Sequence, residues 1–345
     1  MSFTKTIVVS PSGNFYGSEQ VLFDFLTETK NSYIVYAPAK SRFIEKLLRQ
    51  KRHRIRPFSG IKKMYLEVFF FLLWRKANAV YCNEGGHIRY FKVLARIFRG
   101  AKFFVHIRIL EDTSFTRIGG LTNNIVLLSV SEYLTGMMPA YKASVQTIRD
   151  PYIPANITAP IKKYNNNRIR AGIIGRVTET KGLVFIDAFS DFLERNRFSN
   201  IELHLFGDVE TQWKMVSEFV NKVKKYLYVT MQFHGFNDDK NSVYNGIDLV
   251  LHFSKIEPLG RIFFESLDYG TPFIGFNAGG IGEIAKLLNL EDCMINDCDD
   301  WEQELYHRII NAEKSLQKYQ AAREECMKYF SASGYCKAVE ELILV

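Results

Sequence analysis

The sequence predicts an α/β protein made of two Rossmann-like doubly wound domains that face each other across a cleft. Three observations lead to this prediction. The 345 residues exceed one ordinary core and suit two domains. Strand-like and helix-like segments alternate along both halves, which is typical of parallel sheets covered by helices. A stretch rich in proline and polar residues separates the halves, which is typical of a linker.

The first predicted domain covers residues 1–153. It alternates between segments of apolar, β-branched residues and segments with helical periodicity. The predicted strands lie at residues 5–10, 32–36, 79–81, 103–106 and 126–130, and the predicted helices lie at residues 18–29 and near 42–51.

The predicted linker covers residues 154–168, and the second predicted domain covers residues 169–325, where the alternation restarts. Residues 326–345 read as a helical segment that we expect to pack back on the first domain. The predicted strands of the second domain are 169–174, 201–206, 229–233, 247–253 and 272–276, and its helices are 183–195, 212–224 and near 261–269.

The composition is that of a folded globular protein, with 47% hydrophobic and 24% charged residues. Five cysteines form an odd number without a close pair at zinc-ligand or redox spacing, so we expect reduced thiols. The N-terminus runs into a strand-like segment and lacks the pattern of a signal peptide. We therefore expect a cytoplasmic protein.

Positive charge is concentrated in the first half. Residues 40–108 contain 18 Lys or Arg and three acids, a net charge of +15 in a chain whose total is +8. The remainder is therefore acidic by about 7 charges, an asymmetry that indicates an anionic partner for the first half. Nucleic acid and membrane phosphate both fit this charge.

An aromatic and apolar run at residues 64–74 lies within this basic stretch. The run is too short to span a bilayer and contains Glu67. A basic amphipathic stretch follows it at residues 87–99. Two interpretations stay open at this point: the two segments lie in a membrane interface, or they are core-packing helices with solvated basic faces.

The most specific pattern lies at residues 252–283. Glu257 and Glu265 stand eight positions apart and bracket Pro258-Leu259-Gly260, a flexible turn at a predicted helix start. Free N–H groups and the helix dipole at such a start can face a diphosphate. A carboxylate can accept two hydroxyl hydrogen bonds, which suits sugar recognition. The alternative for Glu265 is a surface pair with Arg261.

This segment resembles the donor-binding signature of the large retaining glycosyltransferase family that contains sucrose, glycogen and bacterial polysaccharide synthases, the glycosyl transferases group 1. The resemblance implies the GT-B fold. It also implies that Glu257 holds sugar hydroxyls and that Glu265 holds the ribose diol of a nucleotide sugar, beside the turn at Pro258, Leu259 and Gly260.

A second loop, at residues 172–182, is similar to the family's Gly-Arg…Lys-Gly loop. Gly175 lets the backbone approach a ligand. The guanidinium of Arg176 supplies two parallel N–H donors and the ammonium of Lys181 supplies a point charge, and both suit a diphosphate. Alone, such a loop is usually a turn with solvated charges. Together with the first pattern it predicts a donor site, with Arg176 and Lys181 stabilising the leaving diphosphate.

Two positions of the first domain complete the candidate site. Gly17 lies in a glycine-rich turn similar to the family's N-terminal loop, although Tyr16 replaces a glycine there. His106 ends a predicted strand and matches a histidine that the family places near the reacting sugar. The alternative for His106 is a hydrogen-bonded structural residue. Arg108 is a weaker candidate for binding phosphate or acceptor.

The resemblance implies transfer of a sugar from a nucleoside-diphosphate sugar to a saccharide or lipid-linked acceptor, with retention of configuration. We expect no metal and no cofactor besides this donor, and no nucleic-acid partner. The favoured setting is surface polysaccharide synthesis, with peripheral contact on the anionic inner face of the plasma membrane. The alternatives are a nucleotide-sugar epimerase or hydrolase of the same fold, and a basic non-catalytic module that binds nucleic acid or membrane.

Overall fold

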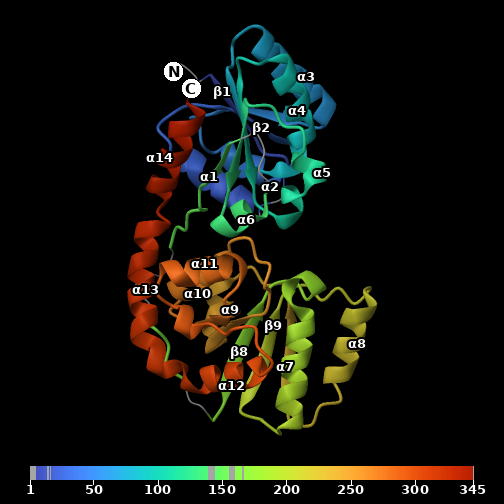
Figure 1. Ribbon diagram of the computed structural model, residues 1–345, viewed down its shortest axis with the longest axis vertical. Coiled ribbons are helices and arrows are strands. Elements are labelled where there is room, and N and C mark those ends of the chain that lie inside the picture. Colours follow the sequence, from blue (N-terminus) through green and yellow to red (C-terminus); the bar gives the residue numbers. More distant parts are fainter. Residues whose placement is uncertain are drawn as a thin grey trace. The chain divides into compact units, whose positions relative to one another are not determined.

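The computed structural model describes residues 5–13, 15, 17–138, 144–154, 160–164 and 167–344. The chain forms two compact units, one from residues 1–153 with 330–345 and the other from residues 154–329 (Figure 1). The segment predicted as a linker, 154–168, therefore falls within the second unit. The second unit extends four residues beyond the predicted 325, because one helix continues to Tyr329.

The first unit is built on a parallel sheet of seven strands in the order β3-β2-β1-β4-β5-β6-β7. Its strand order reverses between β1 and β4, as in a doubly wound fold. The strands are β1 (Thr6–Val9), β2 (Ile34–Pro38), β3 (Arg54–Phe58), β4 (Ala79–Cys82), β5 (Lys102–Ile107), β6 (Ile125–Ser129) and β7 (Ser144–Thr147).

Helices connect these strands and cover the sheet (Figure 1). The last helix of the chain, α14, belongs to this unit and lies beside α1. Near its end, Ile343 O accepts a hydrogen bond from Thr6 Oγ1 of β1 at 2.5 Å. The helices are α1 (Gly17–Glu28), α2 (Arg42–Leu47), α3 (Ile61–Leu73), α4 (Ile88–Ile97), α5 (Phe115–Ile118), α6 (Glu132–Met137) and α14 (Ala332–Ile343).

The second unit is built on a parallel sheet of five strands in the order β10-β9-β8-β11-β12. Its strands are β8 (Ile169–Ile174), β9 (Ile201–Phe206), β10 (Thr230–Gly235), β11 (Leu249–His252) and β12 (Phe273–Gly275). Its helices are α7 (Leu183–Arg195), α8 (Lys214–Val223), α9 (Lys240–Asn245), α10 (Arg261–Asp268), α11 (Gly279–Leu287), α12 (Trp301–Asn311) and α13 (Leu316–Tyr329). Two doubly wound units thus confirm the predicted α/β class.

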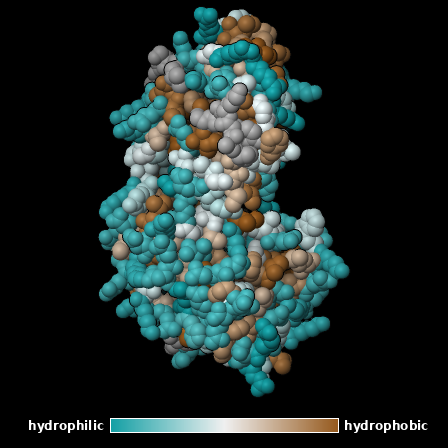
Figure 2. All heavy atoms as spheres, in the orientation of Figure 1, coloured by the Kyte–Doolittle hydropathy of each residue, from teal (hydrophilic) through white to brown (hydrophobic). Residues whose placement is uncertain are grey.

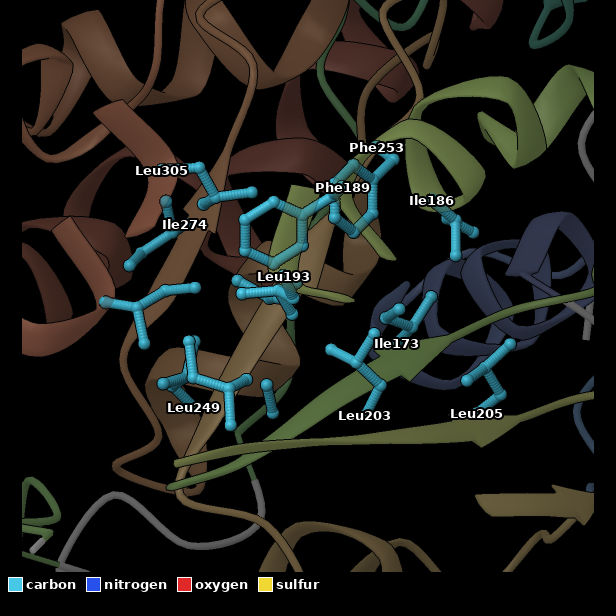
Figure 3. Packing of buried hydrophobic residues seen from close by; sticks show 14 of the residues in the cluster. Ile173, Ile186, Phe189, Leu193, Leu203, Leu205, Leu249, Phe253, Ile274 and Leu305 are labelled. Carbon is cyan, nitrogen blue, oxygen red and sulfur yellow. The ribbon is translucent and has the colours of Figure 1, made fainter. Parts of the chain in front are cut away.

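A hydrophobic core joins the second sheet to its helices (Figure 3). Leu203 and Leu205 of β9 and Leu249 of β11 are fully buried, and they belong to one cluster with Phe189 and Leu193 of α7. The rings of Phe189 and Phe253 lie 6.1 Å apart. Phe253 directly follows β11, so this packing fixes the start of the loop that carries the predicted donor motif.

Candidate functional site

The two predicted donor loops follow neighbouring strands of the second sheet. The strand order reverses between β8 and β11, and residues 175–182 follow β8 while residues 253–260 follow β11. Ligands of open α/β sheets bind beyond the carboxyl ends of the strands at such a reversal. The sequence patterns therefore lie where this fold places ligands.

An ion pair joins the two loops. Lys181 Nζ donates to Glu257 Oε2 at 2.7 Å, and Ser254 Oγ donates to the Thr180 carbonyl at 3.0 Å. Gly182 has φ +84°, and a Cβ there would lie 2.3 Å from Phe253 O, so only glycine allows this approach of the loops. The cation and the carboxylate predicted to bind the donor are thus held together.

The Glu257 carboxylate is ionised despite its burial. Its side chain is 16% exposed, and burial alone would raise the pKa of this group. The charge and hydrogen bond of Lys181 instead lower the pKa below its ordinary value. The site therefore holds a desolvated acceptor for hydroxyl groups.

The turn at Pro258, Leu259 and Gly260 leads into α10. Gly260 has φ +89°, and Leu259 is buried. Gly280 packs against the turn, because a Cβ there would lie 2.4 Å from Pro258 O, and its N–H donates to Glu257 O at 2.8 Å. The glycines at the start of α11 thus support the loop that carries Glu257.

Glu265 lies on α10 and is also held by a lysine. Lys240 Nζ is 2.6 Å from Glu265 Oε1, and Tyr244 Oη is 3.4 Å from Oε2. The side chain of Glu265 is 18% exposed. Glu265 therefore pairs with a residue of α9 and not with Arg261, its alternative partner from sequence.

Gly175 and Arg176 open the first loop. Gly175 has φ +139°, and a Cβ on the neighbouring Gly207 would lie 2.0 Å from Gly175 O. The Arg176 side chain is 62% exposed, and within the described parts of the chain its one ion pair is a 3.4 Å contact with Glu210. Arg176 is therefore available to a ligand, whereas Lys181 is engaged by Glu257.

Gly17 begins α1, after β1, at the reversal point of the first sheet. It is exposed, and Tyr16 lies outside the described residues. The following Ser18 donates to Glu84 Oε1 at 2.5 Å, and Glu84 follows β4. Burial raises the pKa of this glutamate. Sequence reasoning gave Glu84 no role, although it lies at a position where doubly wound folds bind ligands.

His106 is fully buried within the first unit. Its Nδ1 lies 3.0 Å from Tyr81 Oη and 3.3 Å from Arg108 Nη2, and its ring stacks on Tyr335 of α14. Burial, with the charge of Arg108, lowers its pKa well below the ordinary value. Arg108 is itself enclosed and paired with Asp150. These contacts fit the structural alternative for His106, and they show Arg108 held by other side chains of the first unit.

Two further residues of the second unit touch the predicted donor carboxylates and were not predicted. His252 ends β11 with its Nε2 3.8 Å from Glu257 Oε2, and Lys240 contacts Glu265. His252 is the first residue of the pattern at 252–283, so its position in sequence was an available signal. Lys240 is 25 residues from Glu265, and only the packing of α9 on α10 brings them together.

Two doubly wound units, with these loops at the second reversal point, define the GT-B class of fold. Residues 157–325 match the model of the family described as glycosyl transferases group 1, so the second unit is a domain of this family. A curated relative, glycogen synthase 2 of Geobacter metallireducens, is 31% identical over 114 residues. That match covers 32% of this chain and 22% of the relative, so it spans less than a quarter of that protein.

Solved structures of the same fold cover nearly the whole chain. HepE from Anabaena, in complex with UDP and glucose, has a TM-score of 0.71 and 19% identity, with 98% of each chain covered. The lipopolysaccharide outer core galactosyltransferase WaaB has a TM-score of 0.67 and 14% identity, covering 97% of this chain and 98% of its own. Sucrose-phosphate synthase from Thermosynechococcus elongatus has a TM-score of 0.63, 12% identity and 98% coverage of both chains.

Proposed function

We propose that this chain is a glycosyltransferase that moves a sugar from a nucleoside-diphosphate sugar to an acceptor hydroxyl with retention of configuration. The observation that carries the proposal is the Lys181–Glu257 pair, which joins both family loops at the sheet reversal. An anion-binding cation and a hydroxyl-accepting carboxylate stand together there, as a donor with a diphosphate and a sugar requires. Membership of the second unit in the glycosyl transferases group 1 supports the same reaction.

The leaving diphosphate gains negative charge as the glycosidic bond breaks. Arg176, Lys181 and the N-terminus of α10 after Gly260 supply fixed positive potential for that charge. An oxygen of the leaving phosphate takes the proton of the acceptor hydroxyl on the same face, so this route needs no carboxylate nucleophile. Nuclear magnetic resonance measures the anomeric configuration of the product. An inverted configuration would contradict this route.

His106 stays a proposed catalytic residue on the strength of the resemblance. Tyr81, Arg108 and Tyr335 enclose its side chain. A purely structural role therefore predicts a loss of stability without a loss of kcat. His106→Asn is expected to lower kcat of the folded protein, and it is also expected to lower the unfolding midpoint, because the side chain is buried and hydrogen-bonded. A lowered midpoint with kcat unchanged in the folded fraction would instead assign His106 to the core.

The donor site is tested by calorimetric titration of UDP, GDP and ADP, and of their glucose esters, into the full chain. We expect one base to be selected, with UDP tested first because HepE is solved with UDP and UDP-glucose. Glu265→Ala is expected to weaken binding at least about tenfold, since a charge-assisted hydrogen bond contributes about 1.5–3 kcal/mol. EDTA is expected to leave binding unchanged, because the proposed site neutralises the diphosphate with protein groups.

Glu218→Ala is the matched control, since Glu218 is an exposed helical carboxylate of the second unit that pairs with Lys214 at 3.7 Å. Binding of none of the six compounds would contradict the proposal and favour an interaction module. Turnover that does not require an added acceptor would favour the epimerase or hydrolase alternative.

We propose further that the acceptor is a saccharide or lipid-linked saccharide of surface polysaccharide synthesis, used at the cytoplasmic face of the membrane. The feature behind this is a surface on α3 and α4, here called the α3–α4 surface. Stacking of Tyr65 on Tyr90 at 4.6 Å brings the two helices together. The exposed apolar residues of this surface are Leu66, Phe70, Leu73, Trp74, Val93 and Ile97.

Cations surround these apolar side chains. The basic residues of the two helices and their ends are Lys62, Lys63, Arg75, Lys76, Arg89, Lys92, Arg96 and Arg99. Figure 2 shows hydrophobic side chains beside hydrophilic ones at the end of the first unit where Figure 1 places α3. A hollow of about 280 Å³ lies between Arg56, Phe70, Phe71, Trp74 and Lys76, with Glu67 at its side. Apolar groups ringed by cations suit anionic lipid.

Among the described residues, no helix is long and apolar enough to cross a bilayer, so the proposed contact is peripheral. Trp74 and Trp213 are both 61% exposed, one on this surface and the other in the second unit, which provides a matched pair. Vesicles of brominated phosphatidylcholine with phosphatidylglycerol are expected to quench the fluorescence of Trp213→Phe, which keeps Trp74, and to quench Trp74→Phe much less.

Neutral vesicles and high salt are expected to abolish the difference, because the attraction is electrostatic. Equal quenching of both variants, or flotation that is unaffected by anionic lipid, would contradict the membrane proposal. Binding of duplex nucleic acid in place of vesicles would favour the rival partner.

A further inference from the structure

His252 faces the sugar-binding carboxylate of the proposed site from the end of β11. Its side chain is 7% exposed, and its Nε2 lies 3.8 Å from Glu257 Oε2. Within the part of the chain that the structure describes, this nitrogen is buried without a hydrogen-bond partner. Leaving a buried polar atom unsatisfied costs free energy, so such an atom beside a binding site points to a partner gained in another state.

Lys181 occupies the oxygen that His252 faces. Its Nζ donates to Glu257 Oε2 at 2.7 Å, and the described contacts of this carboxylate all use Oε2. A diphosphate with two negative charges competes strongly for a lysine that is 37% exposed. When Lys181 turns to the diphosphate, Glu257 loses a hydrogen bond, which is costly for a carboxylate whose side chain is 16% exposed.

We propose that His252 is a positioning residue, whose Nε2–H takes over the hydrogen bond to Glu257 Oε2 when Lys181 turns to the donor diphosphate. This inference rests on the proposed function. The change requires a shift of about 1 Å, from 3.8 Å to an ordinary hydrogen-bond distance. Glu257 then keeps its orientation, and Oε1 remains for the sugar hydroxyls.

The state of the imidazole fits this role. Burial lowers the pKa of His252 to about 4, although the charge of Glu257 acts in the opposite direction. His252 is therefore neutral at pH 7 and has one N–H to donate. A neutral donor can hydrogen-bond Glu257 without adding a second positive charge. The diphosphate would attract such a charge away from Glu257.

This exchange of hydrogen-bond partners gives the sugar and the diphosphate separate protein contacts. Lys181 and Arg176 act on the diphosphate, and His252 acts only on the carboxylate that holds the sugar. With UDP alone the space for the sugar stays open to water, which can hydrogen-bond Glu257 in place of His252, whereas a bound sugar excludes that water. The added affinity of UDP-glucose over UDP therefore depends on His252, and the affinity for UDP alone depends on it much less. A residue that only stabilised the fold would change both affinities together or neither.

The test is calorimetric titration of UDP and UDP-glucose into the wild type, His252→Leu and His252→Gln, or of the GDP or ADP pair if the panel selects that base. His252→Leu is expected to lower the ratio of UDP-glucose to UDP affinity about tenfold or more, since a hydrogen bond to a charged group is lost. His252→Gln keeps a side-chain N–H and is expected to restore most of the ratio. The affinity for UDP is expected to stay within about threefold.

His204→Leu is the matched control. His204 is also 7% exposed, lies in the same sheet on β9, and has a carboxylate, Glu202, 3.6 Å away. Its side chain lies close to Glu202, Phe206 and His234, and its backbone pairs within the sheet with Gly172 and Gln232. The same chemical change there is expected to leave the ratio unchanged.

An unchanged ratio in His252→Leu would overturn the inference, and so would a His252→Gln variant as weak as His252→Leu. A fall in UDP affinity equal to that of UDP-glucose would also overturn it, because the role would then be structural. Failure of the proposed function looks different, since the wild type would then bind none of the nucleotides.

Discussion

The residues that carry the proposed chemistry are held in a state that costs the folded protein free energy. Glu257 is ionised in a largely enclosed site, and His252 beside it is kept neutral. Neither arrangement improves packing, and an apolar side chain at His252 would fill the strand end without an unsatisfied nitrogen. Such a local conflict with the demands of folding is expected where a protein binds a ligand.

This cost predicts a pH dependence of stability. The pKa of His252 is about 4 in the folded protein and about 6.5 in an unfolded chain. Between these values the unfolded state binds a proton that the folded state does not, so the free energy of unfolding falls as the pH falls from about 6.5 to about 4. The slope is about 1.4 kcal/mol per pH unit, and the total is about 3 kcal/mol.

Urea unfolding of the wild type and His252→Leu at pH 7.5, 5.5 and 4.5 measures this contribution. The variant is expected to lose less stability on acidification, by about 2.5 kcal/mol at pH 4.5. The lowered pKa of Glu257 also makes the folded protein less stable in acid. Glu257 is present in both proteins, so its contribution to the difference largely cancels. Parallel losses in the two proteins would contradict the assigned neutral state.

At the scale of elements, the sequence predicted those parts of the site that short segments determine. The turn at Gly260 and the loop from Gly175 to Lys181 are local patterns between a strand and a helix, and the structure places them there. Strand β3 was not predicted, because Arg54 and Arg56 make the segment polar and Pro57 removes a backbone donor. The sheet tolerates it because β3 is an edge strand.

The contacts that were not predicted join elements distant in sequence. The Lys240–Glu265 pair depends on how α9 packs near α10, and α11 begins with two glycines, which disfavour a helix. Those glycines are needed because Gly280 packs against Pro258 O. Tertiary packing overrides local propensity at both places, so no local rule could have found them.

Helix α14 shows the same dependence on distant contacts. Tyr335 Oη accepts from Arg108 Nη2 at 3.3 Å, and Glu340 Oε1 accepts from Asn31 at 2.7 Å and from Tyr33 at 2.9 Å. The helical pattern of the last residues was visible in the sequence, but their partners just before β2 and just after β5 were not. The first unit is therefore closed by the end of the chain.

At the scale of the whole molecule, the chain crosses between its units twice, before Pro154 and after Tyr329. The second unit is continuous in sequence and contains its own sheet and core. The first unit is discontinuous, because α14 supplies part of its core. The buried residues that α14 adds to this core are Tyr335, Cys336, Val339 and Ile343.

This asymmetry predicts different fates for two fragments. A fragment of residues 154–329 is expected to fold and to bind UDP within about threefold of the full chain, because the proposed diphosphate contacts lie within it. A fragment of residues 1–153 is expected to stay unfolded. It lacks four buried side chains worth about 1.5–3 kcal/mol each, which rivals the roughly 5–15 kcal/mol stability of a whole domain.

Circular dichroism with urea unfolding measures the folding of each fragment, and calorimetry measures UDP binding. A peptide of residues 330–345 added to the fragment 1–153 is the complementary test, and it is expected to restore a cooperative transition by supplying α14. The fragment 154–345 serves as control, since the same helix is of no use to the second unit and should not raise its stability. A folded 1–153 fragment would show that the first unit does not need α14. A 154–329 fragment that folds but binds no UDP when the full chain does would show that the diphosphate contacts are not confined to the second unit.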